Sequence, residues 1–386
     1  MKKLYRLDAW HKLLALRFKS LKWRHGVLIA LLILVTLTKM IPLWGFIYTT
    51  RIYPVIGTLL SPISGIFPFA VGDIFIALSI AWVILYPIYE MGWRKKMVLG
   101  RVAEYLLWVY AWFYIAWGLN YSQPNIYYRI GMKPVEVSKA KFKKFAYQYA
   151  DSLNALSIAS LSNARKSISP DSIVDDALKN RVRDAVLKEY NKIGYREGIN
   201  KPFNQHPHAK TMVFTPLSSM AGVTGSMGPF FCEFTLNGDI LAHDYPATYA
   251  HEFAHFLGVA NEGEANFYSY IVCTASADKQ VRFSGYYHIF FHVLNNVFDI
   301  LGEKEGERFL KHIRPEIIQR ARNDRHYWLS KRCKALDAAQ DFIFELYLKG
   351  NHVAEGRKSY SGVIGLILAW NEKKETILKY KSKKRF

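Results

Sequence analysis

The sequence predicts an α-helical membrane anchor of three spans, followed by a mainly helical α+β domain with a small sheet. Three long apolar runs lie within residues 27–120, and each is long enough to cross a bilayer as a helix. From residue 121 onward the composition becomes mixed, and apolar residues recur at helical spacing between polar positions. We therefore expect a basic N-terminal segment (1–26), a three-span region (27–120) and a separate domain (121–386) in this 386-residue chain.

The first apolar run covers residues 27–48 and follows a strongly basic segment. Residues 1–26 contain eight lysines and arginines against a single acid, Asp8. A cleaved signal peptide is disfavoured because the basic region is too long, the apolar run exceeds a signal core, and no small-residue cleavage site follows. Lys39 interrupts the run, so its ammonium group is expected either to reach the nearer interface or to face a neighbouring helix.

The second and third runs cover residues 71–91 and 98–119, with Trp and Tyr near their ends as in interfacial anchors. The intervening segment 49–70 is rich in Pro, Gly and Ser and carries only Arg51 as a charge, so we expect a re-entrant or interfacial segment. Basic residues at 94–96 place the connector in the cytoplasm by the positive-inside rule. Three spans would then carry the C-terminal domain to the outer side.

The net charge of +21 and pI near 9.6 do not predict nucleic-acid binding. The basic residues gather beside the apolar runs and in the tail 373–385, and no nucleic-acid motif accompanies them. Such clusters favour anionic lipids or fix topology. Three distant cysteines argue against a disulfide framework or a cysteine zinc site. Buried free thiols are the preferred interpretation, with one disulfide left open: Cys232, Cys273, Cys333.

The C-terminal domain shows helical periodicity over residues 139–158 and 171–193, with Gly194 as a stop, and over 285–301, where we expect a buried core helix. A short strand is expected at 212–214. Residues 230–236 form a second β-prone run, which ends at the turn-forming Asn237 and Gly238. We expect this run to be an edge strand that pairs with extended substrate, with these contact residues: Phe230, Phe231, Glu233.

The motif H-E-x-x-H occupies residues 251–255. On a helix, His251 and His255 share one face and can bind one ion, while Glu252 can reach a metal-bound water. Asp244 or Thr248 is expected to cap this helix, Pro246 to lie in its first turn, and Gly258 to end it. The alternative is a helix whose histidines only pack or form hydrogen bonds. The motif and its setting favour one Zn²⁺ ion in a zincin-like domain.

Glu262 and Glu264 are both close enough to supply the third ligand, on a second helix capped by Asn261. Glu262 shares a helical face with Ala265, Asn266 and Ser269. The small side chains of Ala265 and Ser269 allow close packing against the first helix. Glu264 points about 160° away on an ideal helix. We therefore prefer Glu262 and keep Glu264 as the alternative. Asn266 would accept a hydrogen bond from one histidine.

The E-x-x-A-N arrangement at 262–266 resembles the third-ligand helix of thermolysin-like and related gluzincin peptidases, with Asn266 where those enzymes carry Asp and with a shorter gap after the histidines. The chain as a whole resembles an uncharacterised family of bacterial membrane proteins regarded as membrane-anchored zinc peptidases. The shared features are the three-span region, W-G-L-N-Y at 117–121, P-F-F-C-E-F-T-L-N before the site, both ligand motifs and the late segment Y-L-K-G-N-H…S-Y-S-G-V-I. This resemblance implies a bacterial cytoplasmic membrane protein.

These residues predict a zinc-dependent hydrolase that cleaves a peptide or protein substrate, with Glu252 as general base. Tyr360 is a candidate for stabilising the oxyanion, with His326 and Tyr327 as weaker candidates; a structural role is the alternative for each. His288 and His292 are expected to be core histidines rather than a second metal pair. A catalytically silent zinc-binding scaffold or sensor is the alternative function. Cleavage within the bilayer is disfavoured because the motif lies far beyond the third apolar run.

Overall fold

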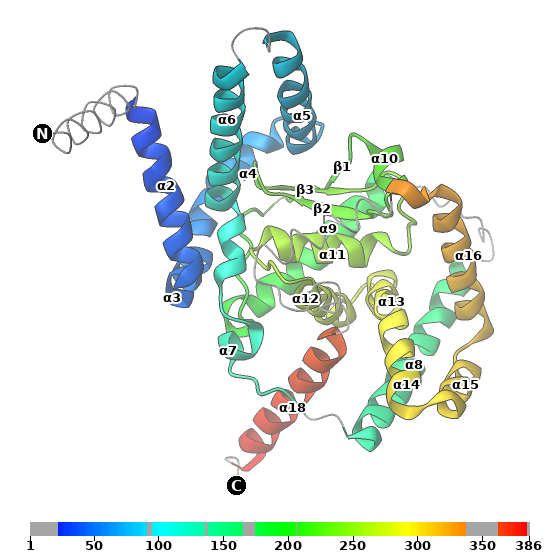
Figure 1. The fold of residues 1–386 in the computed structure, drawn as a ribbon. Helices are drawn as coiled ribbons and strands as arrows, with labels where there is room; N and C mark the ends of the chain where they lie inside the picture. The colour runs from blue at the N-terminus through cyan, green and yellow to red at the C-terminus, as the bar shows by residue number, and fades with distance from the viewer. Residues whose placement is uncertain are drawn as a thin grey trace, which may run out of the picture.

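The computed structural model describes residues 22–90, 95–135, 138–164, 174–205, 207–336 and 362–383. Helices dominate this part of the chain, and a single three-stranded sheet lies beside the central helix α11. Figure 1 shows α5 and α6 projecting from one end of the molecule, with α2 alongside, while the C-terminal helix α18 leaves the opposite end. The helical body and the sheet lie between these two extremes.

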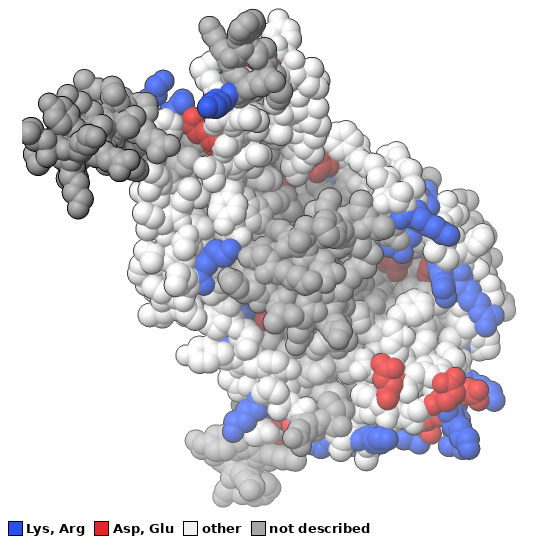
Figure 2. Space-filling model, viewed as in Figure 1, with Lys and Arg blue, Asp and Glu red and all other residues white. Residues whose placement is uncertain are grey.

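Two helices of the described chain are long and apolar enough to cross a membrane: α2 (Trp23–Met40) and α5 (Val71–Glu90). They match the first two predicted spans, and their apolar side chains are largely exposed, which suits a lipid environment. Few charged side chains lie over this projection in Figure 2, whereas blue and red residues gather over α14 to α16. The association of this region with a membrane follows from these two helices.

The third predicted span forms the helix α6 (Lys95–Ala116), followed by the 3₁₀ turn η2 (Gly118–Ser122). It contacts both α2 and α5 but carries Arg101 and Glu104, so it is less apolar than either. Glu104 forms an ion pair with Arg24 of α2 at 2.8 Å. Lys39 also faces α6, where its ammonium group donates to the Tyr114 hydroxyl at 3.0 Å. Lys39 therefore faces a neighbouring helix, which is one of the two predicted alternatives.

The segment between the first two spans is helical. It contains α3 (Pro42–Ile47), a π-helical turn η1 (Tyr48–Ile52) and α4 (Tyr53–Gly65). Exposed apolar residues line this segment, which is the pattern of an interfacial surface: Leu43, Trp44, Ile47, Ile52, Val55, Leu59, Ile63. Tyr53 is instead fully buried, and its hydroxyl donates to the Phe256 carbonyl at 2.7 Å. This bond joins α4 directly to the end of α11.

The predicted helices at 139–158 and 171–193 form as α8 (Lys139–Ala164) and α9 (Asp176–Ile193), and Gly194 follows α9 as expected. The predicted core helix at 285–301 is instead divided at Ile289 between α13 and α14. All three cysteines are free, so no disulfide forms. The remaining helices of the body are α7 (Ile126–Ile130), α10 (Thr215–Met220), α11 (Tyr245–Phe256), α12 (Glu262–Ala275), α13 (Lys279–His288), α14 (Phe290–Leu301), α15 (Glu303–His312), α16 (Pro315–Lys331) and α18 (Gly362–Lys383).

The sheet has the order β1-β3-β2, built from β1 (Lys210–Thr211), β2 (Gly225–Gly228) and β3 (Glu233–Leu236). The predicted edge strand is therefore wrong, because β3 pairs on both sides: parallel with β1 and antiparallel with β2. The hairpin also differs, since residues 229–232 connect β2 to β3 and Cys232 takes a left-handed φ of 48° there. Asn237 and Gly238 lead out of the sheet toward α11 instead. The predicted strand at 212–214 is displaced to β1.

Helix α11 is buried along its whole length, between the sheet and the surrounding helices. Phe234 of β3 packs against Tyr249, Phe253 and Phe256, with ring centroids 5.2–5.9 Å apart. The Tyr190 hydroxyl of α9 donates to the Ala250 carbonyl at 2.7 Å on another side of the helix. Aromatic packing and this bond fix the rotation of α11 and thereby the direction in which its histidines point.

Candidate metal centre

A sharp turn brings the start of α12 back against α11. Gly258 supplies the turn with φ of 94°, a conformation that favours glycine, and α11 ends just before it at Phe256. Asn261 caps α12, because its Oδ1 accepts from the Glu264 amide at 3.0 Å. Both features were predicted. Asp244 occupies the N-cap position of α11, one of the two predicted, but its side chain makes no cap bond. Thr248 lies inside the helix, where its hydroxyl donates to the Asp244 carbonyl.

Three potential ligand atoms converge where the two helices meet. His251 Nε2 lies 3.1 Å from His255 Nε2 and 3.1 Å from Glu262 Oε2, and His255 Nε2 lies 3.5 Å from the same Oε2. Ligands bound to one tetrahedral zinc ion at 2.0–2.1 Å would be separated by about 3.3 Å. The three measured separations bracket this value, so the donor set fits one ion.

The Nδ1 atoms of His251 and His255 both lie within hydrogen-bond distance of an oxygen. His255 Nδ1 lies 2.6 Å from the Val259 carbonyl, which can only accept, so the ring proton must be on Nδ1 in the neutral form. His251 Nδ1 lies 2.8 Å from Asn266 Oδ1, which fixes the same tautomer. Both Nε2 atoms therefore present lone pairs toward each other and toward the Glu262 carboxylate. Three acceptors facing one another require a cation or a proton between them.

The electrostatics of these three side chains agree with this requirement. Burial disfavours charge on His255, but the Glu262 carboxylate outweighs burial and raises the pKa of His255 to about 9. Burial also opposes ionisation of Glu262, yet the two histidines hold its pKa well below the usual range. A proton on His255 thus occupies the position in which a metal ion would neutralise the carboxylate.

Glu252 follows His251 on α11, is buried, and lines the same cavity as the three potential ligand residues. Its Oε2 atom has no hydrogen-bond partner in the part of the chain that the structure describes, which is costly for a carboxylate without a further group nearby. Burial is the largest influence and raises its pKa. Strand β2 approaches this carboxylate closely: a Cβ placed on Gly225 would lie 2.4 Å from Glu252 Oε1. A glycine at this position therefore leaves room for the carboxylate.

The structure places the two candidate third ligands in different environments. Glu262 faces the histidines, whereas Glu264 forms an ion pair with Arg129 at 2.5 Å and accepts from the Ile126 amide at 3.0 Å. Glu264 is thus committed to holding α7 against α12. Ser269 shares the Glu262 face and donates to the Ala247 carbonyl at 2.7 Å, which brings the two helices together along this face.

A cavity of about 870 Å³ opens onto the three ligand atoms. Its walls come from β2, from α11 and α12, and from residues of α5 and α6. Phe230 and Glu233, two of the predicted substrate contacts, line it. Glu233 is occupied, since its carboxylate accepts from the Gly72 amide at 2.5 Å and pairs with Lys210 at 2.7 Å. Phe231 packs against Phe75 of α5, with centroids 5.6 Å apart.

Of the candidates for oxyanion stabilisation, the two that the structure describes are not brought to the site. Tyr360 lies outside the described residues. His326 is exposed on α16, and the Tyr327 hydroxyl donates to the Asp239 carbonyl at 2.8 Å. A second group of potential ligands consists of His243, Asp244 and Asp324 and lies away from the H-E-x-x-H motif. Asp324 accepts from the Tyr287 hydroxyl and lies 2.8 Å from His243 Nε2, while Asp244 lies 3.7 Å from the same nitrogen.

The sequence did not predict that His288 and Arg332 line this cavity. His288 of α13 shares the Asn266 oxygen with His251, at 2.9 Å from its Nε2, and burial lowers the pKa of His288 to about 3. Arg332 lies over Gly222 at the cavity wall. The spacing of His288 and His292 had drawn attention only to a possible metal pair, and nothing in the sequence links Arg332 to a site more than seventy residues earlier.

Comparison with known proteins provides a family but no function. No curated protein and no solved structure matches the chain. The family model described as "Protein of unknown function (DUF3810)" matches residues 48–368, which is most of the chain and includes the whole candidate metal centre. The protein therefore belongs to the DUF3810 family.

Proposed function

We propose that the protein is a membrane-anchored zinc-dependent peptidase with its catalytic domain on the outer side of a bacterial cytoplasmic membrane. The observation that carries this proposal is the convergence of His251, His255 and Glu262 beside Glu252, whose Oε2 has no hydrogen-bond partner among the described residues. A structural zinc site does not need an adjacent base, and its coordination is usually closed by four protein ligands. Three ligands, a buried base and a cavity together favour catalysis.

His251, His255 and Glu262 would hold the ion. When bound, zinc lowers the pKa of a coordinated water and polarises a substrate carbonyl. Glu252 accepts the proton of the attacking water at Oε2 and delivers it to the departing amine nitrogen. Asn266 keeps His251 in the correct tautomer, and the Val259 carbonyl does the same for His255.

Strand β2 is the more suitable surface for an extended substrate. It is an edge strand of the described sheet, it lines the cavity, and its Gly225 faces the Glu252 carboxylate, leaving no room for a Cβ. Its unpaired side can form main-chain hydrogen bonds with a peptide of any sequence. This assignment moves the proposed substrate contact from residues 230–233 to residues 225–228.

Topology supports the location. With α6 as a third span, Lys22, Lys95 and Lys96 would lie on one side of the membrane and the metal centre on the other. Some of the cavity wall comes from α5 and α6, so the substrate is expected to be cleaved close to the membrane surface.

Cleavage by the full-length protein tests the proposal. The purified zinc-loaded protein is incubated with a diverse peptide library, and new termini are identified by mass spectrometry. Glu252→Gln should lower cleavage by about 10²–10⁴-fold while zinc remains bound, because the general base contributes that much. Glu307→Gln, on the exposed face of α15, serves as the matched control and should cleave like the wild type. Equal cleavage by Glu252→Gln refutes the mechanism, and bound zinc without any cleavage favours the silent scaffold.

A further inference from the structure

Helix α10 turns its polar side toward the protein and its apolar side outward. Ser219 is buried, and its hydroxyl donates to the Asp239 carboxylate at 2.7 Å. The Thr215 hydroxyl accepts from the Gly238 amide at 3.2 Å. The outward side of this segment carries four large apolar side chains that are 37–53% exposed: Val213, Phe214, Leu217, Met220. A surface helix of a water-soluble protein has the opposite arrangement, so this face indicates an apolar environment.

A second exposed apolar segment adjoins this face. It consists of residues 66–69, whose three large apolar side chains are 43–76% exposed. The Lys210 ammonium group of β1 donates to the Phe69 carbonyl at 3.0 Å. The Val213 amide donates to the carboxylate of Asp73, in the first turn of α5, at 2.9 Å. These two bonds hold the segments next to each other, and we call their exposed apolar residues the apolar rim: Ile66, Phe67, Phe69, Val213, Phe214, Leu217, Met220.

The chain around the apolar rim carries no charge. Residues 52–72 and 211–232 contain no Asp, Glu, Lys, Arg or His, although 22% of the whole chain is charged. A surface that faces water typically carries charged residues at about 25–35% of its positions. Helix α5 begins at Val71, directly after the first rim segment, and is long and apolar enough to cross a membrane. This continuity points to the lipid around α5, rather than to a second protein, as the environment of the rim.

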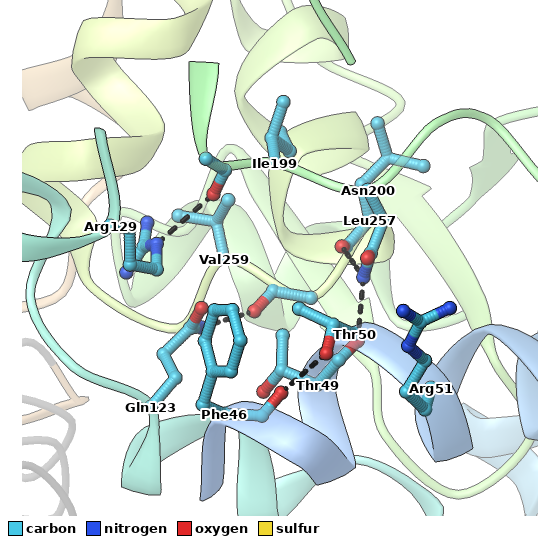
Figure 3. Close-up of a pocket in the computed structure, with 12 residues that line it drawn as sticks. Phe46, Thr49, Thr50, Arg51, Gln123, Arg129, Ile199, Asn200, Leu257 and Val259 are labelled. Carbon is cyan, nitrogen blue, oxygen red and sulfur yellow. Dashed lines mark hydrogen bonds between the residues drawn. The ribbon is translucent and has the colours of Figure 1, made fainter. Parts of the chain in front are cut away.

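Hydrogen bonds attach the helical body to the membrane helices on more than one side. The Trp117 indole, directly after α6, donates to the His255 carbonyl at 3.0 Å. The Asn200 amide donates to the carbonyls of Thr49 and Leu257, at 2.8 and 2.9 Å, and so joins η1 to the loop after α11. Figure 3 shows the Asn200 bonds and the segments that they connect. Because of these attachments, the position of the rim relative to the membrane is set by the inserted helices.

The apolar rim also borders the cavity of the metal centre. Gly72 follows the first rim segment, Gly222 follows the second, and both line that cavity. Ile76 of α5 lines it too, with a side chain that is 42% exposed. A polypeptide that leaves the membrane beside α5 would therefore reach the metal ligands with the residues just outside its membrane segment. A polypeptide in free solution has no such guidance.

From these observations we propose that the apolar rim lies in the lipid interface of the membrane that α5 crosses, and that the cavity beside it takes polypeptides anchored in that membrane and cleaves them just outside their anchors. Each cleavage consumes one water and leaves a new carboxylate and a new amino terminus. Contact between the rim and lipid does not depend on metal binding or catalysis. The substrate class rests on the proposed peptidase function, so two separate measurements are used.

Fluorescence quenching locates the rim. Leu217→Cys is made in a Cys333→Ser background, because the other two cysteines are buried, and is labelled with an NBD fluorophore. The full-length protein is reconstituted in phosphatidylcholine vesicles with ordinary or brominated acyl chains. Brominated lipid should lower the fluorescence at this position at least about twofold, since interfacial apolar side chains reach the acyl boundary.

The matched control is Phe291→Cys, an apolar position on α14 with similar exposure, 49% against 53% for Leu217. Figure 1 shows α14 away from α10, at the lower side of the body. The label at this position should be quenched little. Equal fluorescence of the Leu217→Cys label in both lipids, or equal quenching at the two positions, would overturn the rim.

Cleavage of anchored and free peptides tests the substrate class. The peptide library is fused to a membrane-spanning polyleucine helix, either directly or through a Gly/Ser linker of about 60 residues, which spans about 40 Å. Each fusion is reconstituted in vesicles with the zinc-loaded full-length protein, and the free library is added to a third sample. The directly fused library should be cleaved at least about tenfold faster than the other two. Leu217→Asp should lower this cleavage severalfold with unchanged zinc content, and Phe291→Asp should cleave like the wild type.

The outcomes separate the two proposals. Equal cleavage of all three libraries would keep the peptidase function but refute the membrane-anchored substrate class. Absence of cleavage in every sample would refute the peptidase function, and the substrate class with it, while the quenching measurement still decides the position of the rim.

Discussion

His251 Nε2 lies 3.1 Å from Glu262 Oε2, at the point where α11 and α12 meet. Glu264, two positions later in the chain, points to Arg129 instead. The two glutamates therefore lie in separate environments: Glu262 faces the two histidines, and Glu264 pairs with an arginine of the fold. This division leads to the first prediction.

Glu262→Gln should lower zinc affinity by more than about 100-fold, since even residues that only support ligands are worth 10–100-fold. It should leave the fold intact. Glu264→Gln should retain zinc but lower the free energy of unfolding by about 3 kcal/mol, because Arg129 is left as an unpaired buried charge. Zinc titration and thermal unfolding of both variants measure these effects. The opposite pattern would assign the ligand role to Glu264.

Asn266→Ala should weaken zinc binding about 10–100-fold, because it removes the acceptor that orients His251. The same change also removes the acceptor of His288. His288→Ala is the comparison: it takes away a neighbour of Asn266 but no ligand support, so its zinc affinity should stay within a few-fold of the wild type. Equal losses in the two variants would show that His288 itself binds the metal.

Zinc binding should depend on pH through His255. The pKa of this group is about 9 in the metal-free protein, above its usual 6.5, so His255 carries a proton at pH 7 that zinc must displace. Calorimetry in buffers of different ionisation enthalpy should detect release of about one proton per zinc at pH 7, and affinity should rise about tenfold per pH unit up to about pH 9. Zinc binding without proton release would contradict this account.

The same shift predicts the stability of the metal-free protein. A raised folded-state pKa makes protonation of His255 favourable to folding, so this contribution is complete below about pH 6.5 and is lost as the pH rises through about 9. Thermal unfolding in chelator should show this loss, and His255→Ala should show none of it.

Gly225→Ala should reduce peptide cleavage by about 100-fold with little effect on zinc binding. The added methyl group would overlap the Glu252 carboxylate and displace the base by an ångström or more, which is enough for a loss of this size. Gly362→Ala, at a position where an added Cβ would meet nothing within 4 Å, is the matched control. Full activity of Gly225→Ala would place the working position of Glu252 elsewhere.

The sequence contained enough information to predict the local geometry of the site. The turn at Gly258, the cap at Asn261 and the orientation of Glu262 all follow from helical periodicity and capping preferences within residues 251–266. The helices α2, α5, α8 and α9 were also predicted, because their hydrophobic patterns are long and regular.

What the sequence did not reveal depends on contacts between distant segments. Strand β2 is rich in glycine and gives no strand signal, so β3 was taken for the edge strand. The pairing of Glu264 with Arg129 spans 135 positions, and the bond between His288 and Asn266 spans 22. Only the tertiary structure brings these residues together.

Metal analysis of the full-length protein tests the central claim most directly. The protein is purified without added chelator, exchanged into metal-free buffer and measured by plasma mass spectrometry, beside a double variant, His251→Ala with His255→Ala. We predict one zinc ion per chain in the wild type and less than a tenth of that amount in the variant. A wild-type protein that contains no zinc and takes up none from a stoichiometric supply would contradict the metal centre and the function built on it.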